Sequence, residues 1–455
     1  MPFSEGNAVE LLLDAKENYP AWNDAIEHAE RWIHLEMYII HADPVGRALG
    51  DLLIRKAKEG VRVRLLYDWW GSLGSTVRGF WRRLRRGGVE VRCFNPHRLS
   101  NALSWASRDH RKLLVVDGRI AFVSGLCVGR DWEGDPERGV PPWRDSGVAI
   151  RGPAVAELER AFLDMWKLEG ASVEEREEGT CEAAPAGERA VGVVASSPEM
   201  TRLLRLDLFW AAVARERLWI ADAYFMAIPT YLGALQSAAE DGVDVRLLVP
   251  SASDIQLIAA FSRTQYRPLL DSGVRVFEWK GPMMHAKTAV VDGLWSRVGS
   301  SNLNLASWLG NWELDVSIED EAFGAWMESA YLDDLENSIE IVLAHRRRVR
   351  PAERREGPGG RGHARGSAGR AAAAALSLGK SFGAAITERG VARDEARAFA
   401  GFGLILLLSA AAIAKWPSIL SYTTAVVTGY LGGALLLRAL RLWIRHRRRA
   451  RRDLH

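Results

Sequence analysis

Hydrophobic and polar residues are distributed along the first hundred positions in a pattern that predicts short strands separated by helices. Apolar residues at helical spacing, Trp22, Ile26, Ala29 and Ile33, predict a helix within 21–40 that leads into the apolar stretch Ile39-Ile40, which is typical of a buried strand. Helices are expected over 46–59 and 76–86, because each ends at glycine. β-forming residues predict strands over 61–66 and 89–93. The resulting order of β-α-β-α-β indicates an α/β domain with a mixed or parallel sheet.

The same order of elements returns in the second part of the chain. Residues 242–248 match 60–66 in type, position by position, and residues 273–277 match the start of 88–94. An internal duplication is therefore predicted. The acidic, Gly- and Ala-rich stretch between the copies is typical of a connector. We expect a first half over 1–170, a connector over 171–190 and a second half over 191–345.

One stretch of candidate chemistry occurs once in each half. His110, Lys112 and Asp117 have the same spacing as His285, Lys287 and Asp292, and each aspartate is followed by glycine. The β-forming residues between them predict a strand, in which alternation puts the histidine and lysine on one face. The Asp-Gly pairs predict tight hairpin turns, since both residues accept positive φ. With a two-residue loop, Lys287 would pair with Val298 and His285 with Ser300.

These side chains suit the cleavage of a phosphodiester. A neutral imidazole can attack phosphorus, an ammonium group and small polar donors can hold the charged oxygens, and a second imidazole can protonate the leaving alcohol. A single H-x-K on a strand is more often an ordinary basic surface strand. Its duplication with identical spacing favours catalysis. The candidate residues are His110, Lys112, Asp117, His285, Lys287, Asp292, Ser300 and Asn302.

The pattern H-x-K-x4-D-x6-G-S-x-N resembles the HKD motif of the phospholipase D superfamily. The second copy matches it completely, whereas the first departs from it at Ser124-Gly125-Leu126-Cys127. Within the superfamily the chain is most similar to bacterial cardiolipin synthases, from about residue 6 to about residue 340. Supporting phrases in the same order include 35–39, 94–96, 151–155, 223–225 and 249–254.

The resemblance implies a fold, a reaction and roles for individual residues. The fold would be α/β, with two tandem phospholipase D-like β-α-β repeats forming a pseudo-twofold catalytic body. His110 would attack phosphorus and His285 would act first as acid and then as base. Asp145 and Glu313 lie where the family has an acid that hydrogen-bonds the catalytic imidazole; each could instead be a salt-bridge or helix-end acid. No cofactor and no metal are expected.

The last hundred residues differ in composition from the two halves. A Gly- and Arg-rich stretch at 346–380 is typical of a flexible linker. Apolar runs at 398–414 and 419–437 approach the length needed to span a bilayer, which predicts a C-terminal transmembrane hairpin within 381–455. The alternative is a buried helical pair. Eight arginines over 438–452 would lie in the cytoplasm and contact anionic lipids, which places the catalytic body on the cytoplasmic side of the bacterial inner membrane.

Overall composition restricts the remaining choices. The 455 residues are 48% hydrophobic and 26% charged, with a net charge of +3, as in a globular protein. Three cysteines without ligand spacing predict neither a disulfide framework nor a zinc site. The amino-terminal residues lack the pattern of a signal peptide, so none is expected.

The predicted function is a cardiolipin synthase-type phosphatidyltransferase that acts on phospholipids, with phosphatidylglycerol as the expected donor and a phosphohistidine intermediate. A second hypothesis is a phospholipase D-type hydrolase of lipid or nucleic acid, since water and an alcohol attack the same intermediate. A third is a non-catalytic lipid-binding protein, suggested by the altered motif at residues 124–127. Nucleic acid is not an expected partner, because the halves lack a basic stripe interleaved with aromatic residues.

Overall fold

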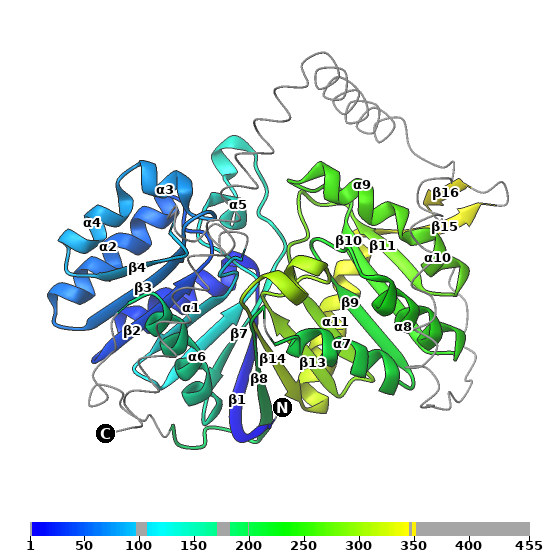
Figure 1. Cartoon of the computed structure of the whole chain (residues 1–455), viewed down its shortest axis with the longest axis horizontal. Helices are drawn as coiled ribbons and strands as arrows, with labels where there is room; N and C mark the ends of the chain where they lie inside the picture. Colours follow the sequence, from blue (N-terminus) through cyan, green and yellow to red (C-terminus); the bar gives the residue numbers. More distant parts are fainter. Residues whose placement is uncertain (1, 97–106, 171–182, 199, 345–347, 352–455) are drawn as a thin grey trace, which may run out of the picture. The chain divides into compact units, whose positions relative to one another are not determined.

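A computed structural model describes residues 2–96, 107–170, 183–198, 200–344 and 348–351. Within these ranges the chain builds a mixed α/β fold around one large sheet (Figure 1). None of the helices in these ranges is long and apolar enough to cross a membrane. The predicted hairpin with its arginine-rich tail lies outside the described residues, as does most of the linker expected over 346–380. The described part of that linker, Arg348–Pro351, is not flexible chain but strand β16, which pairs with β15 (Ser338–Ala344).

The first half contributes seven strands and six α-helices from the described residues. The strands are β1 (Ser4–Leu13), β2 (Trp32–Met37), β3 (Arg62–Asp68), β4 (Glu90–Phe94), β5 (Lys112–Val116), β6 (Ile120–Ser124) and β7 (Ser146–Arg151). The helices are α1 (Asp14–Glu27), α2 (Pro44–Lys58), α3 (Leu73–Val77), α4 (Phe80–Arg86), α5 (Arg130–Glu133) and α6 (Ala154–Leu168), with a 3₁₀ turn at Pro136–Arg138.

The second half repeats this arrangement. Its strands are β8 (Arg189–Ser196), β9 (Arg217–Ala221), β10 (Asp244–Pro250), β11 (Arg275–Trp279), β12 (Thr288–Val291), β13 (Trp295–Gly299), β14 (Glu313–Glu319), β15 (Ser338–Ala344) and β16 (Arg348–Pro351). Its helices are α7 (Arg202–Val213), α8 (Pro229–Glu240), α9 (Gln256–Thr264), α10 (Tyr266–Asp271) and α11 (Glu321–Glu336), with a π-helical turn at Ala306–Gly310.

The order of the strands is the same in both halves when each is followed outward from their junction. The first half runs β1-β7-β6-β5-β2-β3-β4 and the second runs β8-β14-β13-β12-β9-β10-β11, with β15 and β16 beyond it. The junction is the antiparallel pair β1 and β8, visible at the centre of Figure 1. β5 and β12, which follow the two H-x-K sequences, therefore occupy equivalent places in one continuous sheet.

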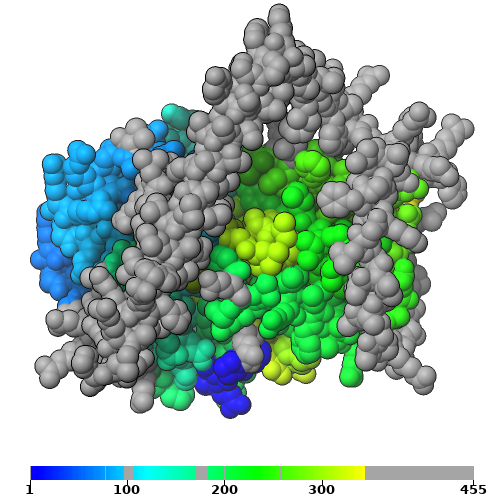
Figure 2. Space-filling model, in the orientation of Figure 1, coloured from blue at the N-terminus to red at the C-terminus, as the bar shows by residue number. Residues whose placement is uncertain are grey.

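The largest hydrophobic cluster joins the two halves. It includes the inward-facing residues of β5 and β12 together with α6 and α11, which pack along the sheet. Each half has a second cluster of its own on the opposite face, covered by α1, α2 and α4 in the first half and by α7, α8 and α10 in the second. In the surface view the blue to teal atoms belong to the first half and the green to yellow atoms to the second (Figure 2). Strands buried on both faces explain the continuous apolar runs of the sequence.

Several predicted boundaries are wrong. The first helix, α1, ends at Glu27, and Ile33 belongs to β2, because the helical spacing of apolar residues continues by chance into the strand. The helix expected over 76–86 is two helices, α3 and α4, separated by Gly79 with a φ of +72°. A left-handed residue cannot lie within a continuous α-helix.

The predicted register of the second hairpin is also wrong, by one residue. Thr288, and not Lys287, pairs with Val298, so His285 does not pair with Ser300. Asp292 and Gly293 do have the expected positive φ values of +52° and +68°, and the N–H of Leu294 bonds to the carbonyl of Val291. However, Trp295 pairs with Val291, so the loop has three residues. The carbonyl of Leu294 accepts a hydrogen bond from the N–H of Asp320 instead.

Candidate active site

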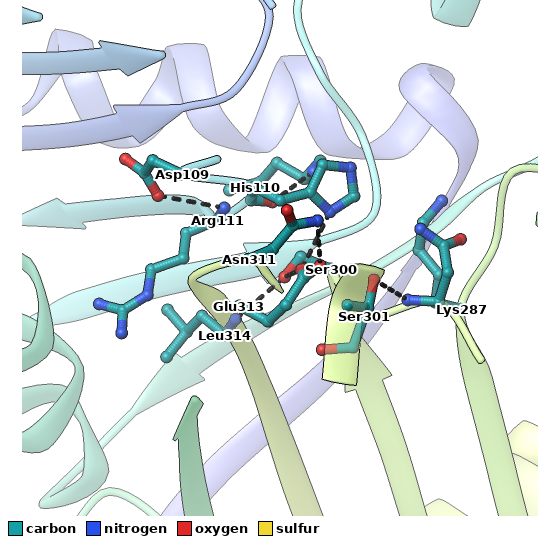
Figure 3. A network of polar contacts seen from close by, with 12 residues as sticks. Asp109, His110, Arg111, Lys287, Ser300, Ser301, Asn311, Glu313 and Leu314 are labelled. Atoms are coloured by element: carbon teal, nitrogen blue, oxygen red, sulfur yellow. Dashed lines mark hydrogen bonds and ion pairs between the residues drawn. The ribbon is translucent and has the colours of Figure 1, made fainter. Parts of the chain in front are cut away.

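The two histidines lie where the halves meet, and each binds a carboxylate from the other half. His110 lies two residues before β5, and its Nδ1 lies 2.9 Å from Oε2 of Glu313 at the start of β14. The backbone N–H of His110 donates to the carbonyl of Trp312 at 2.9 Å, which fixes the residue from the same side. Figure 3 shows the imidazole of His110 directed at Glu313.

The second histidine has the mirror arrangement. Nδ1 of His285 lies 2.6 Å from Oδ2 of Asp145, which directly precedes β7 in the first half. The N–H of His285 donates to the carbonyl of Arg144 at 2.7 Å. The sequence placed Glu313 and Asp145 near the catalytic imidazoles in general. The structure adds that each carboxylate binds the histidine of the other half. Because a carboxylate holds Nδ1 in each ring, Nε2 is the nitrogen left for a substrate.

Burial keeps both imidazoles neutral near pH 7. Burial lowers the pKa of His110, and this effect exceeds the opposing attraction of Glu313. Burial and then the Lys287 ammonium lower the pKa of His285 to about 4. The charge of each lysine also lowers the pKa of the histidine in the other half, so the four groups share one electrostatic environment. Despite its burial, Glu313 has a lowered pKa because His110 and Lys112 stabilise its charge.

The two lysines lie against the histidines. Lys112 Nζ donates to the carbonyl of His110 at 2.5 Å, and Lys287 Nζ donates to the carbonyl of His285. Lys287 Nζ also lies 3.0 Å from Nδ1 of His285. Since the proton on that nitrogen faces Asp145, we interpret this contact as electrostatic. Burial lowers the pKa of Lys287 to about 8, so the ammonium form still prevails at pH 7.

The altered motif of the first half is explained by the carboxylate opposite it. Ser300 donates through Oγ to Glu313 Oε2 at 2.6 Å, and its Oγ accepts the N–H of Leu314 at 2.9 Å. The equivalent residue, eight positions after the turn aspartate, is Gly125. A Cβ there would lie 2.1 Å from Oδ1 of Asp145. A shorter carboxylate thus takes the space that Ser300 takes in the other half.

Ser300 and Asn302 do not have the same surroundings. The hydroxyl of Ser300 is engaged with Glu313, so it is placed to orient that carboxylate and not as a free donor. Asn302 is buried, and its side-chain Oδ1 lacks a hydrogen-bond partner among the described residues. Its counterpart Cys127 is buried as well, and the carbonyl of Cys127 accepts the Tyr19 hydroxyl at 2.7 Å.

The turn aspartates were predicted to join the histidines, and the structure places them elsewhere. The Asp117 carboxylate accepts three backbone N–H groups at the entrance to β2, at 2.7 to 2.8 Å. The Asp292 carboxylate does the same at the entrance to β9, at 2.8 to 2.9 Å. Each aspartate lies at the far end of its strand from the histidine. Their positions indicate that they join neighbouring strands.

Sequence reasoning missed two groups of buried charges beside the histidines. Arg144 bonds through Nε to Asp334 at 2.7 Å and through NH1 to Asp14 at 3.3 Å, directly behind His285. A second group, Glu36, Asp109 and Arg111, lies beside His110. One feature of the sequence did point to both groups of buried charges. Charged residues flank His110 and precede Asp145, whereas Met284 and Ala286 flank His285.

Together these residues form a site with two neutral imidazoles on Nδ1-bound carboxylates and two buried ammonium groups. Such a site provides a nucleophile, a proton carrier and cations for a phosphate. Among the residues that the structure describes, no three His, Cys, Asp or Glu side chains are arranged to hold a metal ion.

Comparison with known proteins gives a consistent result. Residues 23–131 and 211–334 match the family described as "Cardiolipin synthase, PLD-like domain". The chain is 34% identical over 348 residues to a cardiolipin synthase of Alkalihalophilus pseudofirmus, covering 75% of this chain and 68% of that protein. It is 32% identical over 348 residues to a cardiolipin synthase of Halalkalibacterium halodurans, with the same coverage. The crystal structure of a phosphatidylserine synthase of Haemophilus influenzae has the same fold, with a TM-score of 0.59 and 14% identity over 75% of this chain and 89% of that one.

Proposed function

The chain belongs to the cardiolipin synthase family with phospholipase D-like domains, and on that premise we propose that it is a phosphatidyltransferase. It would move a phosphatidyl group from phosphatidylglycerol to an alcohol on a second phospholipid, through a phosphohistidine. One observation carries the proposal at the level of the site. Each imidazole is held by a carboxylate of the opposite half, so both Nε2 atoms are available where the halves meet.

In the first step, Nε2 of His110 attacks phosphorus. His285 takes up a proton from solvent at Nε2 when the anionic phosphate binds. The bond from phosphorus to the glycerol oxygen then breaks, and this oxygen takes that proton. The neutral state of His110 is the one that can attack. The anionic phosphate of the substrate opposes the effect of Lys287 on His285, so substrate binding raises the pKa of His285 towards the value a proton donor needs.

In the second step, the acceptor alcohol gives its proton back to Nε2 of His285 and its oxygen attacks phosphorus. The bond from phosphorus to His110 breaks, which regenerates the free enzyme. Lys112 and Lys287 stabilise the charged oxygens in both steps, and Asn302 contributes a further amide. Glu313 and Asp145 fix the tautomers and support the transient positive charge on the imidazoles.

We further propose that the carboxyl-terminal segment 381–455 anchors the protein in the cytoplasmic membrane as a helical hairpin. Its two apolar runs and its arginine-rich end support this assignment. The catalytic body would then face the cytoplasm. Removal of residues 398–455 should release the body from membranes. If the truncated protein still pelleted with membranes after a high-salt wash, the hairpin would not be the principal anchor.

The test of the function is a product analysis. The purified full chain is incubated with phosphatidylglycerol vesicles, with and without phosphatidylethanolamine, and the lipids are resolved. Formation of cardiolipin with release of glycerol is the expected result. Phosphatidic acid as the sole product would identify a hydrolase that uses the same site. An absence of turnover, in a protein shown to be folded, would contradict both.

A further inference from the structure

Three ionisable side chains beside His110 are excluded from solvent. Glu36 in β2 and Asp109 are fully buried, and Arg111 is 3% exposed. They flank the histidine in space and in sequence, since Asp109 and Arg111 are its chain neighbours. Figure 3 shows Asp109 and Arg111 on the side of His110 that faces away from Ser301 and Lys287.

The carboxyl groups of Glu36 and Asp109 lie side by side, within reach of a hydrogen bond. Two ionised carboxylates are both acceptors, so a bond between them requires a proton on one of them. Within the described part of the chain, no donor group reaches either oxygen of Glu36 or Oδ2 of Asp109, so these buried oxygens are left without a partner. Oδ1 of Asp109 accepts only a backbone N–H, that of Arg111, at 3.3 Å. The geometry therefore calls for one proton between the two carboxyl groups.

The positive charge close to the two carboxyl groups balances one negative charge, not two. Arg111 is the nearest cation, and its NH1 and NH2 groups also bond to the carbonyls of Ala161 at 3.1 Å and Ser196 at 3.4 Å. Burial raises the pKa of Glu36 to about 7 and also raises that of Asp109, against the attraction of Arg111. The other ionisable groups on the packed elements are His34 of β2, Arg64 and Asp68 of β3, Lys112 of β5 and Glu159 of α6.

The other half shows that packing alone does not require these charges. By strand register, the residues equivalent to Glu36, Asp109 and Arg111 are Ala221, Met284 and Ala286. All three are buried in the hydrophobic cluster that joins the halves. The same fold thus accepts an apolar set beside His285. The charged set, which needs a bound proton, occurs only beside His110. It therefore does more than fill the core.

We propose that Glu36 and Asp109 share one proton and that this pair positions His110 for its attack on phosphorus. The inference rests on the proposed function. The backbone N–H of Asp109 donates to Oδ2 of Asp68 at 3.0 Å, and that of Arg111 donates to Asp109 itself. The Asp109 carboxyl group therefore holds the backbone after the histidine, and Asp68 holds it before the histidine. Loss of the shared proton places two adjacent negative charges in the core and pushes Asp109, and with it His110, out of place.

The decisive variant is Glu36→Gln, because an amide N–H replaces the shared proton at every pH. Turnover of phosphatidylglycerol by the full chain is measured from pH 6 to pH 9. We expect Glu36→Gln to stay within about threefold of the wild type below neutral pH. Above the titration of the pair, the ratio of variant to wild-type turnover should rise by about tenfold per pH unit, as for a single ionisation. Asp109→Asn is a second variant with the same expected trend.

The control variant is Glu159→Gln. Glu159 is also a buried carboxylate of the first half, and it bonds to Trp32 and His34, not to the His110 segment. Its pH profile should run parallel to that of the wild type. A Glu36→Gln profile parallel to the wild type, or a large loss of turnover at every pH, would overturn the proposal. The second outcome would mean that an ionised Glu36 paired with Arg111 is needed.

Infrared difference spectroscopy provides a readout that does not depend on turnover or on a folded variant. The wild-type protein should show the carbonyl stretch of a buried protonated carboxyl group below neutral pH, and this band should disappear as the pH rises. Where Glu36→Gln is folded, the band should be missing from it. Absence of the band in the wild type would refute the shared proton. Its presence in a protein without transferase activity would refute the proposed function alone.

Discussion

The two halves place the same imidazole and lysine at the same positions of the same sheet and then surround them with opposite chemistry. His110 has buried charged neighbours, Asp109 and Arg111, whereas His285 has buried apolar ones, Met284 and Ala286. For the residues next to the opposing carboxylates the pattern is reversed, with an apolar neighbour opposite His110 and a charged one opposite His285. His110 faces Glu313 beside Trp312, whereas His285 faces Asp145 beside Arg144.

This difference shows how a duplicated site can assign two roles. The histidine and the lysine of the site are identical in both copies, whereas Asn302 of the second copy has Cys127 as its counterpart. The residues that contact the two imidazoles differ, which fits the proposed division into an attacking histidine and a proton-carrying one. The difference therefore lies in the immediate neighbours of the histidines and not in the H-x-K motif.

The largest effect should come from removing either histidine. His110→Ala and His285→Ala are each expected to lower turnover by about 10³-fold, since each deletes a chemical step. The two variants should differ in the intermediate. With a substrate whose leaving group needs little protonation, His285→Ala should accumulate a phosphoryl adduct on His110, as mapped by mass spectrometry. An adduct on His285 in the His110→Ala protein would reverse the two roles.

The crossed carboxylates should produce the next largest effect. Glu313→Gln is expected to lower turnover about 10- to 100-fold with little change in KM, because it weakens the support of His110 without touching the lipid. Asp145→Asn should do the same through His285. Single-turnover measurements separate them, since Glu313→Gln should slow adduct formation even with a good leaving group and Asp145→Asn should not. Equal behaviour of the two variants would contradict the crossed assignment.

Substitutions of Gly125 and Ser300, which contact the two carboxylates, should have a smaller effect on turnover. Gly125→Ser is expected to lower turnover about tenfold, because its Cβ displaces Asp145 from His285. Ser300→Ala removes one hydrogen bond to Glu313 without a clash and should cost less. The comparison is made on kcat at saturating lipid, with circular dichroism as a check of folding. A harmless Gly125→Ser would show that Asp145 need not lie where the structure places it.

The smallest effect at neutral pH concerns stability. Glu36 has a raised pKa, so between pH 4.5 and about 7 the folded chain binds more protons at this site than the unfolded chain does. Its contribution to stability is fully present below the unfolded pKa and is lost as the pH rises through about 7. Relative to the wild type, Glu36→Gln should gain on the order of a few kcal/mol in free energy of unfolding between pH 5 and pH 8.

Urea denaturation at a series of pH values measures this difference. Glu159→Gln serves again as the control, since the carboxylate it removes lies outside the pair. A difference between Glu36→Gln and wild type that did not change with pH would show that Glu36 is not protonated in the folded chain at neutral pH.

The sequence by itself determined the duplicated α/β halves and the chemical groups of the site. Local patterns carry this information, because alternating apolar residues and glycine stops are set within a few neighbours, and because His110 and His285 stand in identical contexts. The altered residues at 124–127 were visible too. Their meaning was not, since the reason for Gly125 is the carboxylate of Asp145, twenty positions away.

Only the tertiary structure decided which groups meet. The crossing of Glu313 to His110 and of Asp145 to His285 depends on the junction of β1 with β8, which no local pattern specifies. The one-residue error in the hairpin was local instead, since both hairpins have a three-residue loop, over 117–119 and 292–294, where the Asp-Gly pair alone predicts two residues. Buried charges such as Glu36 and Asp109 look like surface residues in a sequence. Their proton sharing exists only because the fold removes both from water and places them side by side.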